Sequence, residues 1–281
     1  VFIFQVVLNS LNMVLDILFV QGFGWDVKGV AGATVIADYS GVMLGWFLMQ
    51  PHLKRLGGTW RGIGIFDRTQ LARLMKINGD IFVRTMALTS AFALFTSFSA
   101  RFGEVTLAAN AVLQNFLMFG SFALDGFAHA AETLVGQAYG AERRKQFLWA
   151  VRKTTIWAIA SAVVMAAIFG LAGPWIIDGL TSIPEVRAAS YSYLLWAVIL
   201  PITGVLGFQF DGVFLGAMQT KHWRNMMLLS VAIYAGMAWG AVVADSNHLL
   251  WASFNAFFLL RGVTLAVLFP TIIPARRVAT V

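Results

Sequence analysis

The chain lacks cysteine and carries few charged residues. Without cysteine among its 281 residues it forms no disulfide bond and no thiolate metal site. Charged residues make up 12% of the chain, about half the roughly 25% that is typical of soluble domains. Hydrophobic residues make up 59%, and the mean hydropathy is +0.77. These proportions exclude a soluble globular domain and indicate a membrane protein.

Catalytic and nucleotide-binding signatures are absent as well. The sequence contains no P-loop, no HExxH, no GxSxG and no Asp-rich prenyl-phosphate motif. We therefore expect neither an enzyme nor ATP-driven transport, and no cofactor. The formal net charge is +7, but the basic residues gather in alternate loops between the apolar stretches and not on one face. No nucleic-acid-binding motif accompanies them. A nucleic-acid partner is therefore not expected.

Long apolar stretches alternate with charged loops and with Gly and Pro residues that end helices. A stretch of about 18–20 apolar residues is long enough to cross a bilayer as a helix. The sequence therefore predicts an all-α membrane protein with eight transmembrane helices. The expected spans are residues 1–21, 29–50, 77–99, 106–138, 151–173, 189–217, 225–244 and 248–270.

The distribution of basic residues predicts the orientation. Of the 20 Lys and Arg residues, fifteen lie in alternate loops and the C-terminal tail, and three lie in the other loops. The remaining two, Arg84 and Arg261, lie within spans. The positive-inside rule places the basic loops and the C-terminus in the cytoplasm. We expect a multi-pass membrane protein with a cytoplasmic C-terminus.

The longest polar stretch, residues 51–76, holds six Lys and Arg residues and separates two spans from six. We interpret it as a cytoplasmic linker between two lobes, with DRTQLARLMKI as a short helix on the membrane surface. The expected domains are the end of an N-lobe (1–50), the linker (51–76), a six-helix C-lobe (77–270) and a cytoplasmic tail (271–281). Because the chain starts at Val1 inside an apolar run, we expect a 6+6 protein that lacks its first four helices.

Two polar residues interrupt the first span. Asn12 and Asp16 are four apart, so they lie on one helix face, and an intramembrane Asp costs at least a few kcal/mol. In a hairpin of spans 1 and 2, Asp16 lies level with Thr34. Asn12 lies level with Asp38, about 6 Å deeper. Such oxygen atoms suit a hard cation such as Na⁺ or a proton, but hydrogen bonds between helices explain them equally well.

Several segments resemble a known family. NMVLD and GVAGATVIAD resemble the fifth and sixth helices of multidrug and toxic compound extrusion (MATE) transporters. LDGFAHAAETLVGQAYGAERRK, FDGVFLGAMQTKHWRNMM and LLRG resemble the DNA-damage-inducible F (DinF) branch. The resemblance implies a cation-coupling site at Asn12, Asp16 and Thr34, which are also the Na⁺ ligands if sodium drives transport. We add Asp38 to this site. The family site also uses an Asp on the first helix, which this chain does not contain.

The resemblance implies a secondary antiporter that works by alternating access of two lobes. By this resemblance we expect a monomer in the lipid bilayer of the bacterial inner membrane, which exports small amphipathic or cationic compounds in exchange for H⁺ or Na⁺. A lipid-linked oligosaccharide flippase of the same superfamily is the alternative, although its cavity is expected to carry more cationic side chains than Arg84 and Arg261. A non-transporting membrane scaffold is a further alternative, and it leaves the intramembrane acids unexplained.

Two pairs of charges in the later spans are expected to be structural. Asp80 and Arg84 are one helical turn apart and are expected to neutralise each other. Asp211 and Arg261 are isolated opposite charges. They are expected to form an ion pair, because an unpaired buried charge is expensive.

A third group, Asp125, His129 and Glu132, forms an i, i+4, i+7 stripe on one helix face. This stripe is a candidate substrate cavity or proton relay. Ion pairs with neighbouring helices, for example with Arg84, are the structural alternative.

Overall fold

The computed structural model describes residues 2–56 and 67–274, and every regular element in them is a helix. In order along the chain these are α1 (Phe2–Ile17), η1 (Leu18–Gly22), α2 (Asp26–Leu56), α3 (Arg68–Ser99), η3 (Ala100–Phe102), α4 (Glu104–Gly140), α5 (Arg144–Leu180), α6 (Pro184–Gly216), α7 (Thr220–Val243), α8 (Asn247–Leu268) and η4 (Phe269–Ile272). Eight helices are long and apolar enough to cross a membrane, which confirms the predicted fold class. The chain divides into two compact units, residues 1–68 and 69–281.

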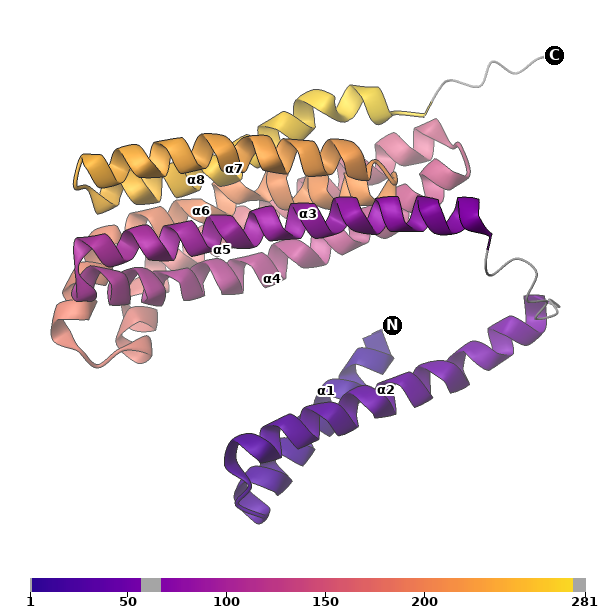
Figure 1. Cartoon of the computed structure of the whole chain (residues 1–281), viewed down its shortest axis with the longest axis horizontal. Coiled ribbons are helices and arrows are strands. Elements are labelled where there is room, and N and C mark those ends of the chain that lie inside the picture. Colours follow the sequence, from indigo (N-terminus) through magenta and orange to yellow (C-terminus); the bar gives the residue numbers. More distant parts are fainter. Residues whose placement is uncertain (1, 57–66, 275–281) are drawn as a thin grey trace. The chain divides into compact units, whose positions relative to one another are not determined.

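The first unit is a helical hairpin in which α1 folds back along α2 (Figure 1). The two helices pack closely where small residues face the partner. A Cβ atom at Gly41 of α2 would lie only 2.9 Å from a methyl carbon of Leu8 on α1. Ala33 and Ala37 are buried on the same helix. Small residues let helix backbones approach each other in a membrane, where packing drives association.

The turn of this hairpin is short. After the π-helical turn η1, the backbone passes through Gly24 with a φ of +67°, a conformation that glycine adopts readily. The rings of Phe19, Phe23 and Trp25 cluster here, with centroids 5.3–6.0 Å apart. Asp26 in the first turn of α2 complements the positive end of the helix dipole.

The predicted linker, residues 51–76, is mostly helical where the structure describes it. Helix α2 continues through Pro51, which membrane helices tolerate because neighbouring groups satisfy the freed backbone. The expectation of a separate short helix at residues 67–77 is wrong, since Arg68 onward belongs to α3. No Gly or Pro interrupts this stretch, and its Leu, Arg, Met and Lys favour continuation of the helix. Linker residues 57–66 and tail residues 275–281 lie outside the described residues.

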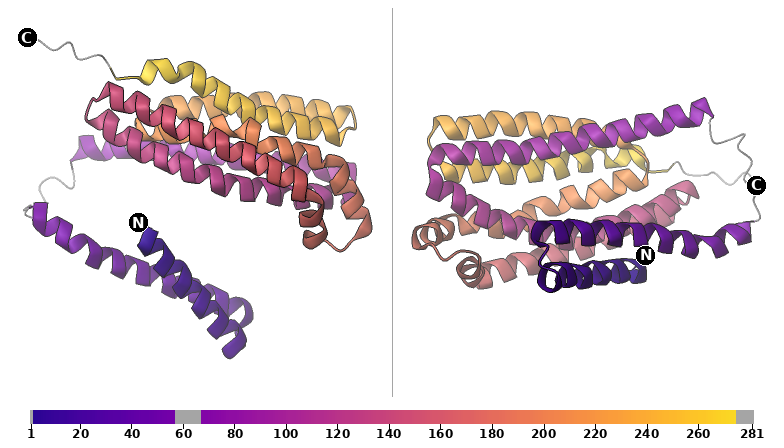
Figure 2. Two further views of the ribbon diagram at one scale, coloured as in Figure 1. Left: turned by 180° about the vertical axis from the view of Figure 1, so that it is seen from behind. Right: turned by 60° about the horizontal axis from the view of Figure 1, so that its bottom comes forward.

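The second unit is a six-helix bundle made of α3 to α8 (Figures 1 and 2). Helix α6 packs against α4, α5, α7 and α8. Its closest approach is to α4, because Gly212 and Gly216 lie one turn apart on the facing side. A Cβ atom at Gly212 would lie 2.0 Å from the carbonyl oxygen of Ala128, and one at Gly216 would lie 2.5 Å from that of Glu132. The backbones of α4 and α6 are therefore in direct contact.

Short turns connect neighbouring helices of the bundle. After α4, α6 and α7 one residue reverses the chain with a positive φ: Glu142 (54°), Met218 (57°) and Asp245 (47°). In each case the following amide closes a hydrogen bond to the carbonyl five residues earlier, as in a Schellman motif. The amide of Arg143, for example, donates to the carbonyl of Ala138 at 2.9 Å. These turns favour antiparallel packing of consecutive helices.

The core between α3, α4 and α8 is aromatic, with one polar cluster. Phe95, Trp251 and Phe254 are fully buried, with ring centroids 4.5–6.2 Å apart. Next to them, Asn110 of α4 and Asn247 of α8 exchange hydrogen bonds of 2.8 and 3.0 Å. The Trp251 indole donates to Asn110 at 2.8 Å. This buried network ties α4 to α8 with its polar groups satisfied.

Candidate functional site

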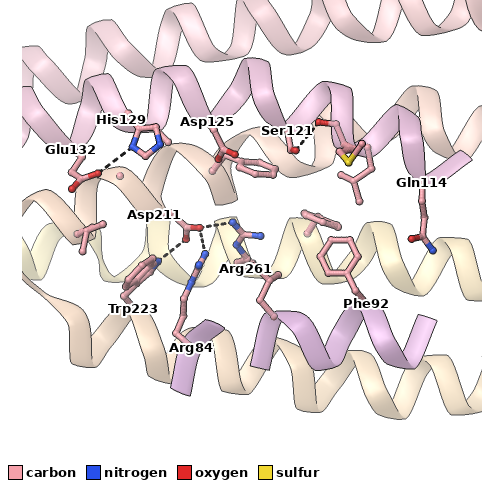
Figure 3. Close-up of a pocket in the computed structure, with 18 of the residues that line it drawn as sticks. Arg84, Phe92, Gln114, Ser121, Asp125, His129, Glu132, Asp211, Trp223 and Arg261 are labelled. Carbon is pink, nitrogen blue, oxygen red and sulfur yellow. Dashed lines mark hydrogen bonds and ion pairs between the residues drawn. The ribbon is translucent and has the colours of Figure 1, made fainter. Parts of the chain in front are cut away.

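A cavity of about 680 Å³ opens inside the second unit (Figure 3). Side chains of α3, α4, α6, α7 and α8 line it. The charged lining residues are Arg84, Asp125, His129, Glu132, Asp211 and Arg261. The larger apolar side chains of the lining are those of Leu88, Phe92, Leu117, Met118, Phe208, Leu215, Trp223 and Phe258. Ligand pockets typically combine such an apolar lining with a few polar groups.

Asp211 of α6 is the centre of a charge cluster. Its Oδ2 atom accepts hydrogen bonds from Arg84 of α3 and Arg261 of α8. Its Oδ1 atom accepts one from the indole nitrogen of Trp223 on α7, at 2.7 Å. The side chains of Arg84, Asp211 and Arg261 are only 12%, 13% and 2% exposed. A single carboxylate thus connects four helices.

Aromatic rings cover both guanidinium groups of this cluster. The Cζ atom of Arg84 lies 4.3 Å from the ring centroid of Trp223. That of Arg261 lies 5.0 Å from Phe208 and 5.7 Å from Phe258. Cation–π attraction of this kind supports a positive charge where water is scarce. Because two guanidinium groups share one carboxylate, these three side chains together carry one positive charge in excess, and the carboxylate of Asp125 lies within electrostatic range of both arginines.

Helix α4 brings the stripe of Asp125, His129 and Glu132 to the same cavity (Figure 3). The Nδ1 atom of His129 lies 3.4 Å from Glu132 Oε2, with side chains 78% and 37% exposed. Asp125 makes no hydrogen bond or ion pair with any other residue that the structure describes, and no interaction is drawn to it in Figure 3. The α4 wall therefore presents acidic groups that are open to the cavity.

The polar residues of the hairpin unit lie along the contact of α1 with α2. Asn12 donates to the Thr34 hydroxyl at 3.5 Å, and that hydroxyl donates to the carbonyl of Val30 at 3.0 Å. The hydrogen-bond partner of Thr34 on α1 is thus Asn12. The expected hairpin geometry instead places Asp16, one helical turn further along α1, at the depth of Thr34. The Oδ1 atom of Asp16 is buried and has no hydrogen-bond partner in the described part of the chain. Asp38 is exposed on α2.

Within the described ranges, no group of three or more His, Cys, Asp or Glu side chains is placed to hold a metal ion. The side-chain oxygens of Asn12, Asp16 and Thr34 therefore remain the candidate ligands for a monovalent cation. An unpartnered buried carboxylate oxygen such as Asp16 Oδ1 fits this role, because a bound cation or proton would compensate it.

Comparison with known proteins shows the family. The MatE family model matches residues 81–239. The DNA damage-inducible protein F of Escherichia coli is 37% identical over 266 residues, which are 95% of this chain and 58% of that protein. The chain belongs to the MatE family. These matches also confirm the predicted resemblance to the DinF branch. A second MatE relative, Protein DETOXIFICATION 44, chloroplastic, of Arabidopsis thaliana, is 27% identical over 74% of this chain and 39% of that protein.

Solved MATE structures share the fold of this MatE chain. The Vibrio cholerae transporter VcmN, in a mutant form, superposes with a TM-score of 0.87 at 17% identity, over 98% of this chain and 62% of that one. An outward-facing multidrug resistance MATE family transporter gives 0.83 at 18% identity, over 96% and 61%. The chain thus spans roughly half the length of the relatives that it matches. MatE proteins are membrane transporters and not enzymes, as the sequence predicts.

One predicted ion pair of the MatE chain is wrong. Asp80 does not pair with Arg84, although both lie on α3. Asp80 is buried, accepts a hydrogen bond from Thr220 at 2.8 Å and forms an ion pair with Arg224, both on α7. Arg84 instead reaches Asp211 on α6. The face of α3 that carries both charges meets two different helices, and buried charges take the partners that satisfy them best.

The structure places Asp211 and Arg261 together, and it gives this pair neighbours that the sequence did not assign to it. Arg84 joins this pair and becomes a cavity residue. Trp223 and Phe208 hold the guanidinium groups. A signal for the two arginines was available, since they are the basic residues that lie well inside the predicted spans and away from their ends. Nothing in the sequence distinguishes the lining aromatics from those that face lipid.

Proposed function

We propose that this protein is a secondary antiporter that exports amphipathic or cationic compounds in exchange for H⁺ or Na⁺. The cavity of the six-helix unit carries the proposal, because its charged and aromatic lining suits an amphipathic compound. In this mechanism the hairpin belongs to an N-lobe, the six-helix unit is the C-lobe, and the two alternate in access. We further propose that the protein acts as a monomer in the bacterial inner membrane.

Asp16 is the proposed coupling carboxylate. A buried carboxylate oxygen without a partner is costly in a membrane, and binding of a proton or Na⁺ removes that cost. Asn12 and Thr34 add oxygen atoms within the same contact, and Asp38 adds a second carboxylate on α2. An ion site on the hairpin and a substrate site in the bundle are the two sites that exchange requires.

Replacement of Asp16 tests this function. Asp16→Asn keeps the shape of the side chain but removes its charge and its titration. Cells that produce the variant at the wild-type level should export a fluorescent cation no faster than cells without the protein. Asp26→Asn is the matched control, because Asp26 is an exposed acid on the same hairpin, and it should leave export unchanged. Full export by Asp16→Asn would reject the assignment.

The coupling ion is decided in proteoliposomes. Uptake of the same fluorescent cation into the vesicles is measured with an imposed Na⁺ gradient at constant pH, and then with an imposed pH gradient without Na⁺. The gradient that drives uptake against the concentration of the compound identifies the ion. In both experiments Asp16→Asn should give no gradient-driven transport.

The orientation has its own test, because the chain contains no native cysteine. Arg55→Cys at the end of α2 and Thr181→Cys after α5 are the two single substitutions. The proposed topology predicts that a membrane-impermeant maleimide labels Thr181→Cys from outside intact cells and labels Arg55→Cys only after the cells are opened. Labelling of both from the same side would overturn the topology.

One observation favours a second function. Two arginines that lie well inside the predicted spans, Arg84 and Arg261, line the cavity. A flippase for lipid-linked oligosaccharides needs positive charge to bind a pyrophosphate. Movement of a labelled lipid-linked oligosaccharide across vesicle membranes, at a rate that Arg84→Gln lowers, would support this function. A scaffold without transport activity would show neither this movement nor any effect of Asp16→Asn.

A further inference from the structure

The carboxylate of Asp211, at the centre of the cavity's charge cluster, has most of its hydrogen-bond acceptor positions occupied. Asp211 accepts two hydrogen bonds at Oδ2 and one at Oδ1, from donors on three helices. A carboxylate offers about four acceptor positions. A cationic compound in the cavity therefore gains little from Asp211 unless it displaces an arginine that is already bound there.

The two arginines, in contrast, keep unused donors. A guanidinium group has five N–H bonds, and the contacts to Asp211 use only the Nη2 nitrogen of Arg84 and of Arg261. The Nε atoms of both residues are buried and have no partner among the described residues. Figure 3 shows the second terminal nitrogen of Arg261 with no partner drawn. Because these Nε atoms are buried, the donors available to a ligand are those of the terminal nitrogens that Asp211 leaves free, and the group of Arg84, Asp211 and Arg261 carries one excess positive charge.

We propose that Arg84 and Arg261 form an anion-binding pole of the cavity, and that the substrates include amphipathic compounds with a carboxylate, sulfonate or phosphate group. This inference rests on the proposed function of the cavity and names the substrate class. The planar fork of a guanidinium group matches the oxygen atoms of such anions, which hold it through two parallel hydrogen bonds. An anion bound here also balances the excess charge of the cluster.

The aromatic lining gives the ligand its apolar part. Phe208 and Phe258 lie against the guanidinium group of Arg261, so an acidic group bound by Arg261 places its apolar body on these rings. Phe92 of α3 extends the apolar surface (Figure 3). On the α4 wall, Asp125 and Glu132 would meet a basic group of the same compound, if it has one. The fitting ligand is therefore an acidic or zwitterionic compound with an aromatic body.

The test compares three probes with one ring system and different charge: 1-pyrenesulfonate, 1-pyrenemethanol and 1-pyrenemethylammonium. Binding to the whole protein in a non-ionic detergent is measured by calorimetry. The sulfonate should bind at least about tenfold more tightly than the neutral alcohol, the difference expected of a charge-assisted hydrogen bond. A wild-type protein that binds the sulfonate no better than the alcohol overturns the proposal without the use of any variant.

Arg84→Gln is the informative variant, because it leaves Arg261 and Asp211 as a balanced pair. It should weaken sulfonate binding about tenfold and change binding of the alcohol less than twofold. Arg84→Lys keeps the charge without the fork and should weaken sulfonate binding less than Arg84→Gln does. Arg101→Gln is the control, because Arg101 also lies over an indole ring, that of Trp239, but does not line the cavity.

The outcomes separate the two proposals. Unchanged sulfonate binding by Arg84→Gln, with the wild-type melting temperature, overturns the anion pole and leaves the cavity as a substrate site. Binding of none of the three probes by the wild-type protein removes the cavity as a substrate site, and the proposed function then fails together with the anion pole.

Discussion

Two carboxylates, one in each unit, have opposite surroundings. Asp211 in the six-helix bundle accepts hydrogen bonds from three side chains. Asp16 in the hairpin has a buried oxygen atom with no partner in the residues that the structure describes. A saturated carboxylate stabilises the fold, and a further ligand has to break an existing contact to reach it. An unsatisfied one weakens the fold but is available to a proton or a cation. The comparison supports a structural role for Asp211 and is consistent with the exchange role that we propose for Asp16.

The largest expected effect on stability is that of Asp211→Asn. The substitution leaves Arg84 and Arg261 side by side in a buried site without the carboxylate that both of them bind. Breaking a buried ion pair in this way costs about 3–5 kcal/mol. The melting temperature and the yield of monodisperse protein in detergent should both fall sharply. Asp125→Asn is the control, since Asp125 has no ion pair within the described residues, and a stable Asp211→Asn protein would contradict the structural role.

A second difference between the units lies in their glycines. An added Cβ at Gly212 meets the carbonyl oxygen of Ala128 at 2.0 Å, so the α4 and α6 backbones have to separate. Gly212→Ala should therefore cost about 1–3 kcal/mol, the usual range for overpacking. In the hairpin, Gly41→Ala meets only the end of the Leu8 side chain at 2.9 Å, which rotates away at smaller cost.

Thermal unfolding of the two alanine variants, followed by circular dichroism, checks this difference. Gly126→Ala provides the baseline, because nothing lies within 4 Å of an added Cβ there. Equal destabilisation by Gly212→Ala and Gly126→Ala would show that the close contact of α4 and α6 is not limiting for stability.

A smaller effect is expected for Glu132→Gln. Its ion-pair partner is the exposed His129, and exposed pairs contribute about 0–1 kcal/mol, so folding should be nearly unchanged. If Glu132 attracts cationic compounds to the cavity, the affinity for 1-pyrenemethylammonium should fall about two- to fivefold, while that for 1-pyrenemethanol stays the same. Poor folding with equal loss for all probes would instead indicate a structural role.

The smallest effect on stability is expected for Asp16→Asn. The substitution removes a charge with an unsatisfied buried oxygen, so the melting temperature should stay the same or rise slightly. Export should nevertheless be lost, and this separation of stability from activity is what distinguishes Asp16 from Asp211. A marked loss of stability would show that Asp16 has a structural partner.

The sequence predicts the spans well and the contacts between them poorly. Hydropathy and length are properties of one segment, so all eight helices could be recognised. The proximity of Asp211 and Arg261 could be expected because each is an isolated charge in an apolar span. Asp80 and Arg84 were paired through their spacing along α3, but both bind other helices. Which helices meet depends on packing between residues that are more than a hundred positions apart in the sequence. The spacing of residues within one helix carries no information about these contacts.

The cavity shows the same limit. The stripe of Asp125, His129 and Glu132 was visible as a helix face, and that face lines the cavity. The aromatic side chains of the lining could not be selected, since the chain contains 24 Phe and 10 Trp residues. The contact at Gly212 was equally hidden, because a glycine in a membrane helix is common and only a partner helix shows whether it is needed.

The shared carboxylate also has a consequence for the order of events during synthesis. Arg84 precedes Asp211 by 127 residues, so the ribosome completes α3 long before the counter-charge on α6 exists. At about 5–20 residues per second, the arginine waits for about 6–25 s. During this time α3 enters the membrane without the carboxylate that Arg84 binds in the finished bundle, and an arginine at the centre of a membrane helix costs about 2.5–3.5 kcal/mol. The acid available to it is Asp80, one turn away on the same helix, whose partner Arg224 is also not yet made. Arg261 has no such delay, because Asp211 is already made when α8 appears. Mutations at Asp211 should therefore leave the insertion of α3 unchanged and lower the stability of the finished bundle.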